Sequence, residues 1–377
     1  MSVVNTRLKK HFVGINHKKN NMKNISLCMI VKDEQKTLQR CIDSIKDFVD
    51  EIIIVDTGSK DNTKQIARQF TDKVYDFVWC DNFSLARNYA LSKASKEYIM
   101  WLDADDIVPP RTLNFLVKNK SKMTCDTYML KYDVAFTDGK PTYSFYRERI
   151  LKNDSRCFWQ GAVHEYITPF GEVVKLNIAI EHRKEKLHDK NRNLKIYNKL
   201  KKQKIFNARE QYYYSRELFD HQKYKLAITN FQKLIKMKDA WIENVIEAHY
   251  LLSICYNKQN NHKKEIEILF STFLYDTPRA NICYRIASYF YQAHNYDNAI
   301  YWFIVATKCK DVIDKGTFVD NRFYNYYPYL GLCCAYYQKG DIKNAIYYNN
   351  KAGECFLSKE VEYNKKLFEQ TTNVQTI

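Results

Sequence analysis

The sequence predicts an α/β domain with a mostly parallel sheet, followed by an all-helical domain built from repeats. Between residues 25 and 106, short apolar runs alternate with segments of helical periodicity, and a polar cluster follows most of the runs. From about residue 205 onward only the helical periodicity remains. A chain of 377 residues is long enough to build a separate core in each of two domains.

Strands and helices of the first domain follow one another in a regular order. Four apolar runs predict buried strands at residues 25–31, 51–55, 74–78 and 98–102. Helical spacing of apolar side chains predicts helices at residues 34–46, after residue 62 and at residues 84–93. Asp61 or Asn62 suits the N-cap of the middle helix. This alternation is typical of a mostly parallel sheet that binds ligands at the carboxyl ends of its strands.

Helix pairs recur in the second half of the chain. The segments YKLAI (224–228), YDNAI (296–300) and DIKNAI (341–346) place alanine and aliphatic residues at matching positions. We expect each segment to begin the second helix of a pair, in a pattern that resembles tetratricopeptide repeats. A further helix pair, around residues 248–270, is degenerate. The expected organisation is a basic tail (1–24), an α/β domain (25–182), a basic helical linker (183–205), the repeats (206–360) and a polar tail (361–377).

The composition bounds the classes of partner and the compartment. The formal net charge is +17, which suits a nucleic acid, an anionic membrane surface or a phosphorylated small molecule as partner. No apolar run is long enough for a transmembrane helix. The 11 cysteines are odd in number and include no CxxC pair, so they lack the paired spacing of a zinc site or of a disulfide framework. We therefore expect a reduced, cytoplasmic protein.

Three carboxylates follow the fourth predicted strand: Asp103, Asp105 and Asp106. Capping a helix requires only one of them, and three within four residues repel one another unless a cation lies between them. Hard divalent ions such as Mg²⁺ and Mn²⁺ take oxygen ligands of this kind together with phosphate oxygens. The local pattern therefore favours a metal–diphosphate site.

Another carboxylate, Asp56, ends the second predicted strand and is followed by the turn residues Gly58 and Ser59. At such a position a carboxylate can accept hydrogen bonds from a base or a ribose, while the glycine permits a sharp turn. Aspartate and serine are also ordinary turn residues, so this segment alone leaves both interpretations open.

Four motifs in this order resemble those of family 2 glycosyltransferases of the GT-A fold, a Rossmann-like α/β fold. They are SLCMIVKDE (26–34), VDTGSKDN (55–62), DNFSLARNYAL (81–91) and WLDADD (101–106). The segments WQGAVHE (159–165) and DKNRNL (189–194) resemble the subgroup with C-terminal tetratricopeptide repeats, which includes the sublancin-type peptide S-glycosyltransferases. The resemblance extends from about residue 25 to residue 350.

The resemblance implies a nucleotide-sugar site. Asp56 would hydrogen-bond the base, usually uracil, Asp103 would contact the ribose, and Arg87 with its neighbour would face the diphosphate or the sugar. The full implied set of nucleotide-sugar-binding residues is Val31, Lys32, Glu34, Asp56, Ser59, Arg87, Asn88, Asp103 and Ala104.

The resemblance also implies a metal site and a catalytic base. Asp105 would coordinate the Mn²⁺ or Mg²⁺ that bridges the two phosphates, and His164 would be a further metal ligand. Many members of the family use a Glu-Asp pair as the base, which this sequence lacks. Glu165, beside His164, takes that role in our interpretation, and Asp106 is the next candidate.

We expect an inverting glycosyltransferase that moves a hexose or N-acetylhexosamine from a nucleotide sugar, a UDP-sugar, to a peptide, protein or glycan acceptor. One alternative is an inactive repeat scaffold, which the crowded carboxylates disfavour. Another is a basic nucleic-acid-binding protein, for which no recognition motif of the usual aromatic kind is found. The repeats, from about Ala208 to Phe356, would present the acceptor or a partner chain. Alternatively, they would cover the sheet or form a homodimer.

Overall fold

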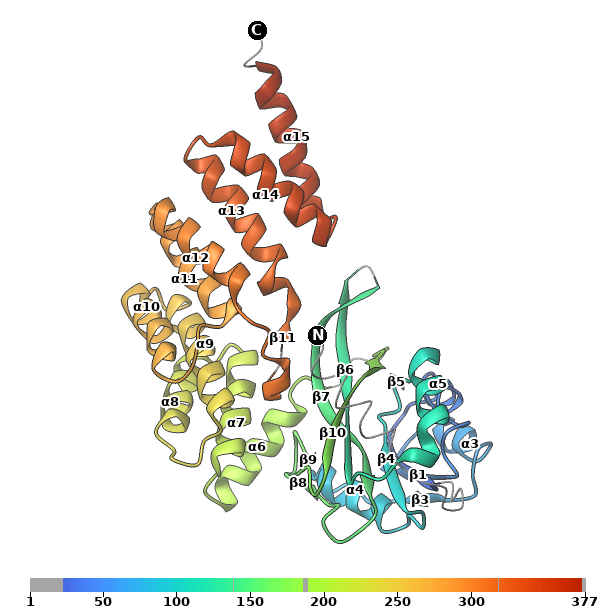
Figure 1. Cartoon of the computed structure of the whole chain (residues 1–377). Helices are drawn as coiled ribbons and strands as arrows, with labels where there is room; N and C mark the ends of the chain where they lie inside the picture. The colour runs from blue at the N-terminus through green and yellow to red at the C-terminus, as the bar shows by residue number, and fades with distance from the viewer. Residues whose placement is uncertain (1–22, 138, 186–188, 318, 375–377) are drawn as a thin grey trace. The chain divides into compact units, whose positions relative to one another are not determined.

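The computed structural model describes residues 23–137, 139–185, 189–317 and 319–374 (Figure 1). The chain divides into two compact units, residues 1–196 and 197–377, and each is described by itself. Residues 1–22, which make up most of the predicted basic tail, lie outside the described residues, as do residues 186–188 of the predicted linker.

The first unit contains a mixed, mostly parallel sheet with the strand order β3-β2-β1-β4-β7-β6-β10-β5. The pairs β1–β2, β1–β4, β2–β3 and β6–β10 are parallel, and β4–β7, β6–β7 and β5–β10 are antiparallel. This arrangement confirms the predicted fold class. The strands are β1 (Ile25–Val31), β2 (Glu51–Asp56), β3 (Val74–Asp76), β4 (Tyr98–Trp101), β5 (Asp106–Ile107), β6 (Thr127–Thr137), β7 (Lys140–Lys152) and β10 (Val173–His182).

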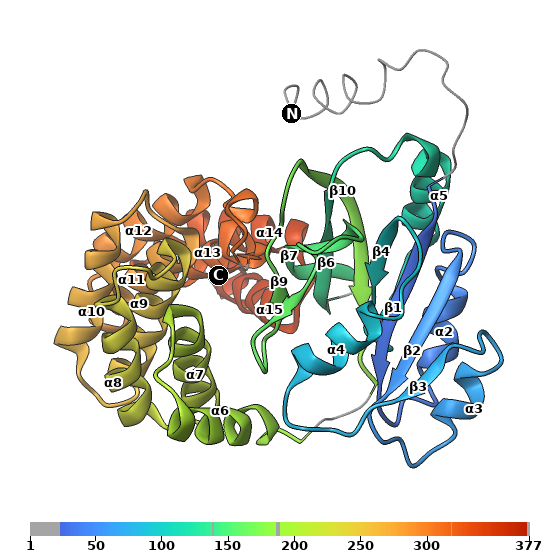
Figure 2. The same ribbon diagram turned by 90° about the horizontal axis from the view of Figure 1, so that it is seen from below.

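Alternating side chains of β1 supply the two faces of this sheet. Leu27 and Met29 pack with α2, whereas Cys28 packs with Ala90 of α4. Since successive side chains of a strand point to opposite faces, the uninterrupted apolar run of β1 is explained by helices on both sides. Figure 2 shows α4 on one side of β1 and β2, with α2 and α3 on the other. The helices are α2 (Leu38–Asp43), α3 (Thr63–Ala67), α4 (Phe83–Leu91) and α5 (Pro110–Asn119).

The strand ends place the polar residues of the site. The parallel strands β1, β2 and β4 end at Val31, Asp56 and Trp101, so the residues that follow them lie along one edge of the sheet. His182, the last residue of β10, is the antiparallel partner of Asp106 in β5. A separate hairpin of two short strands, β8 (Trp159–Gln160) and β9 (Tyr166–Ile167), flanks this edge.

The second unit consists of successive helix pairs, and α6 (Arg192–Gln203) contains the boundary between the two units. Second helices begin at Tyr224, Tyr296 and Ile342, close to the repeated segments of the sequence, and the pair around residues 248–270 is complete. The predicted polar tail is helical to Val374, with Phe368 buried. The elements are α7 (Ala208–Asp220), α8 (Tyr224–Ile235), α9 (Ile242–Asn257), α10 (His262–Ser271), α11 (Ala280–Gln292), α12 (Tyr296–Lys308), β11 (Val319–Asp320), α13 (Tyr326–Gln338), α14 (Ile342–Cys355) and α15 (Lys359–Val374).

The turns inside the helix pairs share one backbone conformation. A residue with positive φ lies just before the second helix of each pair: Gln222 (57°), Asn260 (57°), His294 (57°) and Gly340 (77°). In three of the pairs the next residue caps the second helix, with its side chain accepting the backbone N–H three residues on: Asn261, Asn295 and Asp341. The left-handed residue and the cap together reverse the chain within a few residues.

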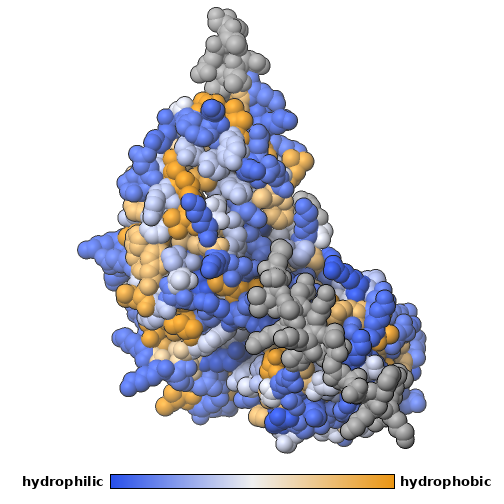
Figure 3. Space-filling view, viewed as in Figure 1, coloured by the Kyte–Doolittle hydropathy of each residue, from blue (hydrophilic) through white to orange (hydrophobic). Residues whose placement is uncertain are grey.

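The face of the molecule in Figure 3 is mainly hydrophilic, and its apolar side chains are scattered among polar ones. Within the described ranges, the structure has no helix that combines the length and the apolar character needed to cross a membrane.

Candidate active site

A cavity of about 630 Å³ lies within the first unit at the carboxyl edge of its sheet. Its size suits a nucleotide sugar, because ligand pockets of this kind measure roughly 300–1,000 Å³. The segments after β1, β4 and β10 form its walls, together with the β8–β9 hairpin and the start of α6. Nine of the predicted site residues line it: Val31, Lys32, Glu34, Arg87, Asp103, Ala104, Asp105, His164 and Glu165.

Four predicted site residues, Asp56, Ser59, Asn88 and Asp106, are not among the described residues that line this cavity. Asp56 is buried, and its Oδ1 accepts the backbone N–H groups of Gly58 and Ser59, each at 2.9 Å. Its Oδ2 has no hydrogen-bond partner among the described residues. The Ser59 hydroxyl accepts the backbone N–H of Asp33 at 2.8 Å, so it fixes the loop after β1.

Asp106, the second predicted candidate for the base, is fully buried, and its carboxylate accepts several hydrogen bonds, both of which disfavour that role. Its carboxylate accepts hydrogen bonds from Arg149 Nη1 (3.0 Å), the Tyr132 hydroxyl (2.7 Å) and the Asp103 backbone N–H (3.0 Å). Arg149 is itself completely buried, with its guanidinium 3.8 Å from the ring centroid of Trp101. A general base must reach the proton that it abstracts, and Asp106 has no exposed surface with which to do so.

A group that could hold a divalent metal ion consists of Asp105, Asp106 and His182, whose ligand atoms all lie within 4.8 Å of one another. His182 Nδ1 is 3.3 Å from a carboxylate oxygen of each aspartate. Two carboxylates and an imidazole suit a hard or borderline divalent ion. His164, which we predicted as the histidine ligand, is not in this group. His182 is therefore a second candidate for the histidine ligand, and the assignment of His164 stays a prediction.

Opposing effects act on His182. Burial lowers its pKa, but the hydrogen bonds that the imidazole donates to Asp105 and Asp106 outweigh burial and raise the pKa to about 10. The electrostatic field at this position therefore strongly favours a positive charge. Asp106 already accepts from several other donors, so its main effect on the metal group is to orient the imidazole.

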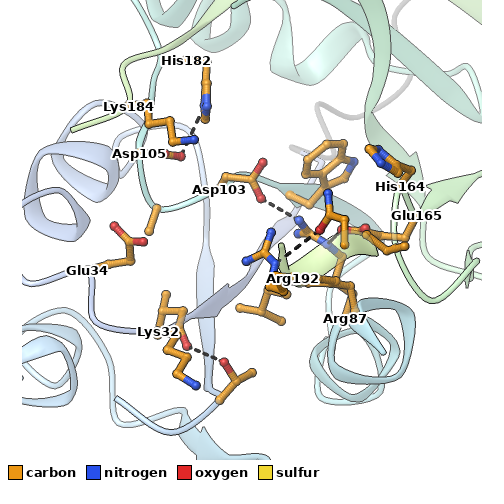
Figure 4. Close-up of a pocket in the computed structure, with 18 of the residues that line it drawn as sticks. Lys32, Glu34, Arg87, Asp103, Asp105, His164, Glu165, His182, Lys184 and Arg192 are labelled. Carbon is orange, nitrogen blue, oxygen red and sulfur yellow. Dashed lines mark hydrogen bonds and ion pairs between the residues drawn. The ribbon is translucent and has the colours of Figure 1, made fainter. Parts of the chain in front are cut away.

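Arg87 bridges two carboxylates on the other side of the cavity (Figure 4). Its Nη2 is 2.6 Å from Asp103 Oδ1 and its Nε is 2.7 Å from Glu165 Oε1. The guanidinium lies 4.6 Å from the ring centroid of Trp159 and 5.2 Å from that of Trp101. Burial raises the pKa of Asp103, but the neighbouring Arg87 outweighs burial and holds that pKa well below its usual range. Asp103 and Glu165 are thereby fixed relative to each other.

Asn88, the next residue of α4 after Arg87, forms hydrogen bonds with the backbone of Trp159. Its Nδ2 donates to the Trp159 carbonyl at 3.0 Å, and its Oδ1 accepts the Trp159 backbone N–H at 2.8 Å. Both polar groups of the amide are therefore directed at the β8–β9 hairpin. Asn88 is not among the described residues that line the cavity, and its predicted contact with the diphosphate or sugar stays a prediction.

Basic side chains that we did not assign also line the cavity: Arg147, Lys184 and Arg192. Figure 4 shows Lys184 beside Asp105 and His182, with Arg192 nearer the centre of the view. The Arg192 guanidinium lies 4.6 Å from the ring centroid of Phe83. Cations around a cavity that also holds carboxylates suit a phosphate-bearing ligand. The segment DKNRNL was noted in the sequence for its family resemblance, and its Arg192 is the residue that reaches the site.

Curated proteins with similar sequences include a TPR repeat-containing protein and a glycosyltransferase. A TPR repeat-containing protein of Synechococcus elongatus is 49% identical over 85 residues, covering 22% of this chain and 21% of that protein. The SPbeta prophage-derived glycosyltransferase SunS of Bacillus subtilis is 26% identical over 271 residues, covering 65% of this chain. The chain thus spans about a fifth of the first relative and 62% of the second.

Solved structures show weaker likeness. Residues 1–349 of S. aureus TarS, crystallised in complex with UDP-GlcNAc, are 13% identical, with a TM-score of 0.36 over 76% of this chain and 91% of that one. A crystal structure of MamA is 20% identical, with a TM-score of 0.36 over 47% of this chain and 92% of that one.

A family profile described as Glycosyl transferase family 2 matches residues 26–219. The match contains the four motifs after β1, β2, β3 and β4, and every residue described above as lining the cavity. Because it spans more than half of the 377 residues, the chain belongs to glycosyl transferase family 2.

Proposed function

We propose that the protein is an inverting glycosyltransferase that moves a hexose or N-acetylhexosamine from a UDP-sugar to a peptide, protein or glycan acceptor. One observation carries this proposal. Asp105 and His182, two members of the group that could hold a metal ion, line the same cavity as a carboxylate, Glu165, with Asp103 and Arg87 between them. Membership of glycosyl transferase family 2 supports the same reaction class.

The donor would bind along the edge formed by β1, β2 and β4. The loop Val31–Glu34 would line the base, and Asp103 would accept a hydrogen bond from a ribose hydroxyl. Asp56 Oδ2 is buried without a partner among the described residues. An unsatisfied buried acceptor costs free energy that a ligand donor would recover, and the imide N–H of uracil is such a donor.

Asp105 and His182 would hold Mn²⁺ or Mg²⁺, with Asp106 orienting the imidazole. A bound divalent ion would supply positive charge at the diphosphate. Lys184 and Arg192 would add charge-assisted hydrogen bonds to the phosphate oxygens and help to stabilise the departing nucleoside diphosphate.

Glu165 would act as the general base. As the acceptor oxygen, sulfur or nitrogen attacks the anomeric carbon, its proton passes to the Glu165 carboxylate, and the bond from that carbon to the diphosphate oxygen breaks. Attack opposite the leaving group inverts the configuration. The ion pair with Arg87 fixes the position of the carboxylate.

The helix pairs of the second unit would present the acceptor. Stacked helix pairs make an extended surface suited to a peptide or another chain. The repeats are rich in tyrosine, which contributes contact area with little loss of side-chain entropy.

Calorimetry with UDP, with and without Mn²⁺, tests the donor and the metal together, and a panel of UDP-sugars scored for hydrolysis tests turnover. We expect tight UDP binding that chelation weakens. Asp105→Ala should abolish turnover with the fold retained, whereas Asp72→Ala, an exposed carboxylate away from the cavity, should behave as wild type. Equal UDP affinity after chelation would exclude the metal role, and absence of both binding and hydrolysis would favour the inactive scaffold.

A further inference from the structure

We propose that α4 positions the catalytic hairpin, and that Asn88 is the residue that does so most directly. The hairpin, residues 159–167, carries Glu165 between its strands β8 and β9. This inference rests on the proposed role of Glu165 as base, and it assigns to Asn88 a function on the acceptor side of the cavity.

The Asn88 amide pairs with the Trp159 backbone as a neighbouring strand would. It donates to the carbonyl at 3.0 Å and accepts the N–H at 2.8 Å. A primary amide has one carbonyl and one NH₂ group, and both are used here. Because the two hydrogen bonds involve both the N–H and the carbonyl of Trp159, the amide fixes the orientation of this residue as well as its position.

Further contacts join the same face of α4 to the hairpin. The Phe83 backbone N–H donates to the Ala162 carbonyl at 2.8 Å, and the Ser84 hydroxyl donates to the Gly161 carbonyl. Phe83 is the first residue of α4, where backbone N–H groups have no partner inside the helix. With the Arg87–Glu165 ion pair at 2.7 Å, residues at helical spacing hold the start, the tip and the carboxylate of the hairpin.

The hairpin by itself has little to fix its shape. Its strands are two residues long each, and an isolated two-stranded ribbon of any length is marginally stable in water. His164, next to Glu165, has φ 52°, a left-handed conformation that is strained for a non-glycine residue. Such a conformation persists where the surroundings determine it, and the contacts of α4 supply those surroundings.

Loss of the hydrogen bonds between Asn88 and the hairpin should displace Glu165 but leave the donor-binding residues in place. A displacement of about 1 Å between a catalytic group and its substrate can lower turnover about a hundredfold. Arg87 also contacts Asp103, so its replacement would disturb both sides of the cavity. Among the described residues, the Asn88 side chain forms hydrogen bonds with the hairpin alone, and its replacement therefore separates the two effects.

The test compares Asn88→Ala, Asn88→Asp and the control Asn153→Ala. Asn153 donates to the backbone carbonyls of Lys96 and Ala94 in the same unit, so its loss also removes side-chain-to-backbone bonds, but away from the cavity. We expect Asn88→Ala to lower kcat about tenfold to a hundredfold with the Kd for UDP unchanged. Asn88→Asp keeps the acceptor for the Trp159 N–H and should recover part of the loss, and Asn153→Ala should keep the wild-type kcat.

A double-mutant cycle with Glu165→Gln shows whether Asn88 affects turnover through Glu165. If Asn88 acts through Glu165, the double variant loses no more turnover than Glu165→Gln alone. Additive losses, or a wild-type kcat for Asn88→Ala, overturn the proposal.

Amide hydrogen exchange keeps the test independent of the proposed function. In Asn88→Ala, residues 159–167 should exchange faster, and those of β1 should not. If the wild-type chain transfers no sugar, the proposed function fails, while faster exchange still supports the attachment. Unchanged exchange in the hairpin overturns the attachment, whatever the activity.

Discussion

His182 and His164 lie at different places on the cavity wall, and their replacement separates two possible ligand sets. We expect His182→Ala to weaken Mn²⁺-dependent UDP binding at least about tenfold, because it removes the only nitrogen ligand of the described metal group. His164→Ala is the matched control and should change Mn²⁺ dependence little. Calorimetric titration of Mn²⁺ in the presence of UDP measures both. A larger effect at His164 would restore the ligand set expected from the sequence.

Glu165 can be tested by removing only its charge. Glu165→Gln keeps the size of the side chain but cannot take a proton from the acceptor, so transfer should fall by more than about a hundredfold. UDP affinity should barely move, because the Glu165 carboxylate is joined to Asp103 on the donor side through Arg87 and does not contact it directly. Initial rates of transfer and UDP calorimetry give the two numbers. Normal turnover in Glu165→Gln would place the base elsewhere, and Asp106 is too buried to replace it.

At the level of single residues, the sequence predicted the cluster of carboxylates after β4, but not the residues from distant parts of the chain that contact it. Asp105 reaches the cavity as expected because it follows a strand end directly. His182 was missed, since only the antiparallel pairing of β10 with β5 brings it beside Asp106, more than 70 residues away. The signal in the sequence was the apolar run before His182, which predicts another strand ending in a polar residue. The hydrogen bonds of Asn88 to Trp159 could not be predicted, because a motif does not show where an amide points.

Among the secondary-structure elements, too, those with a clear local sequence pattern were predicted, and those that depend on distant parts of the chain were not. The parallel strands β1, β2 and β4 were predicted because strands buried on both faces are continuous apolar runs. The long hairpin β6–β7 was not predicted, and neither was β10. The buried residues of these strands are interrupted by partly exposed ones, so no strand is a continuous apolar run, and β10 pairs with β6 from a distant part of the sequence. Helix α2 is shorter than the apolar periodicity implied, because the segments on either side of it are turns.

Glu51 joins several of these elements at the start of β2. Its carboxylate accepts from the Ser26 hydroxyl of β1, from the Ser95 backbone N–H and hydroxyl at 2.8 Å each, and from Lys73. Burial raises the pKa of Glu51, but these donors outweigh burial and lower the pKa to about 2. A carboxyl with a depressed pKa stabilises the fold above its ordinary value of about 4.5, and that stabilisation disappears as the pH falls toward 2.

We therefore expect Glu51→Gln to destabilise the first unit at pH 7 by on the order of 3 kcal/mol. The difference from wild type should shrink as the pH falls from about 4.5 toward 2. Urea unfolding followed by tryptophan fluorescence across that range measures it. Glu97→Gln, which removes an exposed ion pair with Lys23, is the control and should change stability by about 1 kcal/mol or less. A pH-independent penalty for Glu51→Gln would mean that packing, and not charge, is lost.

For the whole molecule, the division into two units allows the acceptor role of the repeats to be tested by truncation. Tyr197 is buried against Phe206 and Tyr214, so a fragment ending at Lys204 should carry Tyr197→Gln to avoid an exposed ring. We expect this fragment to hydrolyse the UDP-sugar but to fail to glycosylate its natural target. The full chain with Tyr197→Gln is the control. A fragment that aggregates, or that is monomeric where the full chain is a dimer, would assign the repeats to stability or assembly.

The left-handed residues that precede the second helices of the repeats have a consequence for heat tolerance. Gln222, Asn260 and His294 adopt a backbone conformation that glycine adopts without strain, and the matching position of the last pair is Gly340. Replacing the three by glycine removes that strain at the cost of a more flexible unfolded chain, and we expect a net gain of a few tenths of a kcal/mol at each position. None of the three lines the cavity. The melting temperature could therefore be raised one repeat at a time, while the wild-type rate of donor hydrolysis is retained.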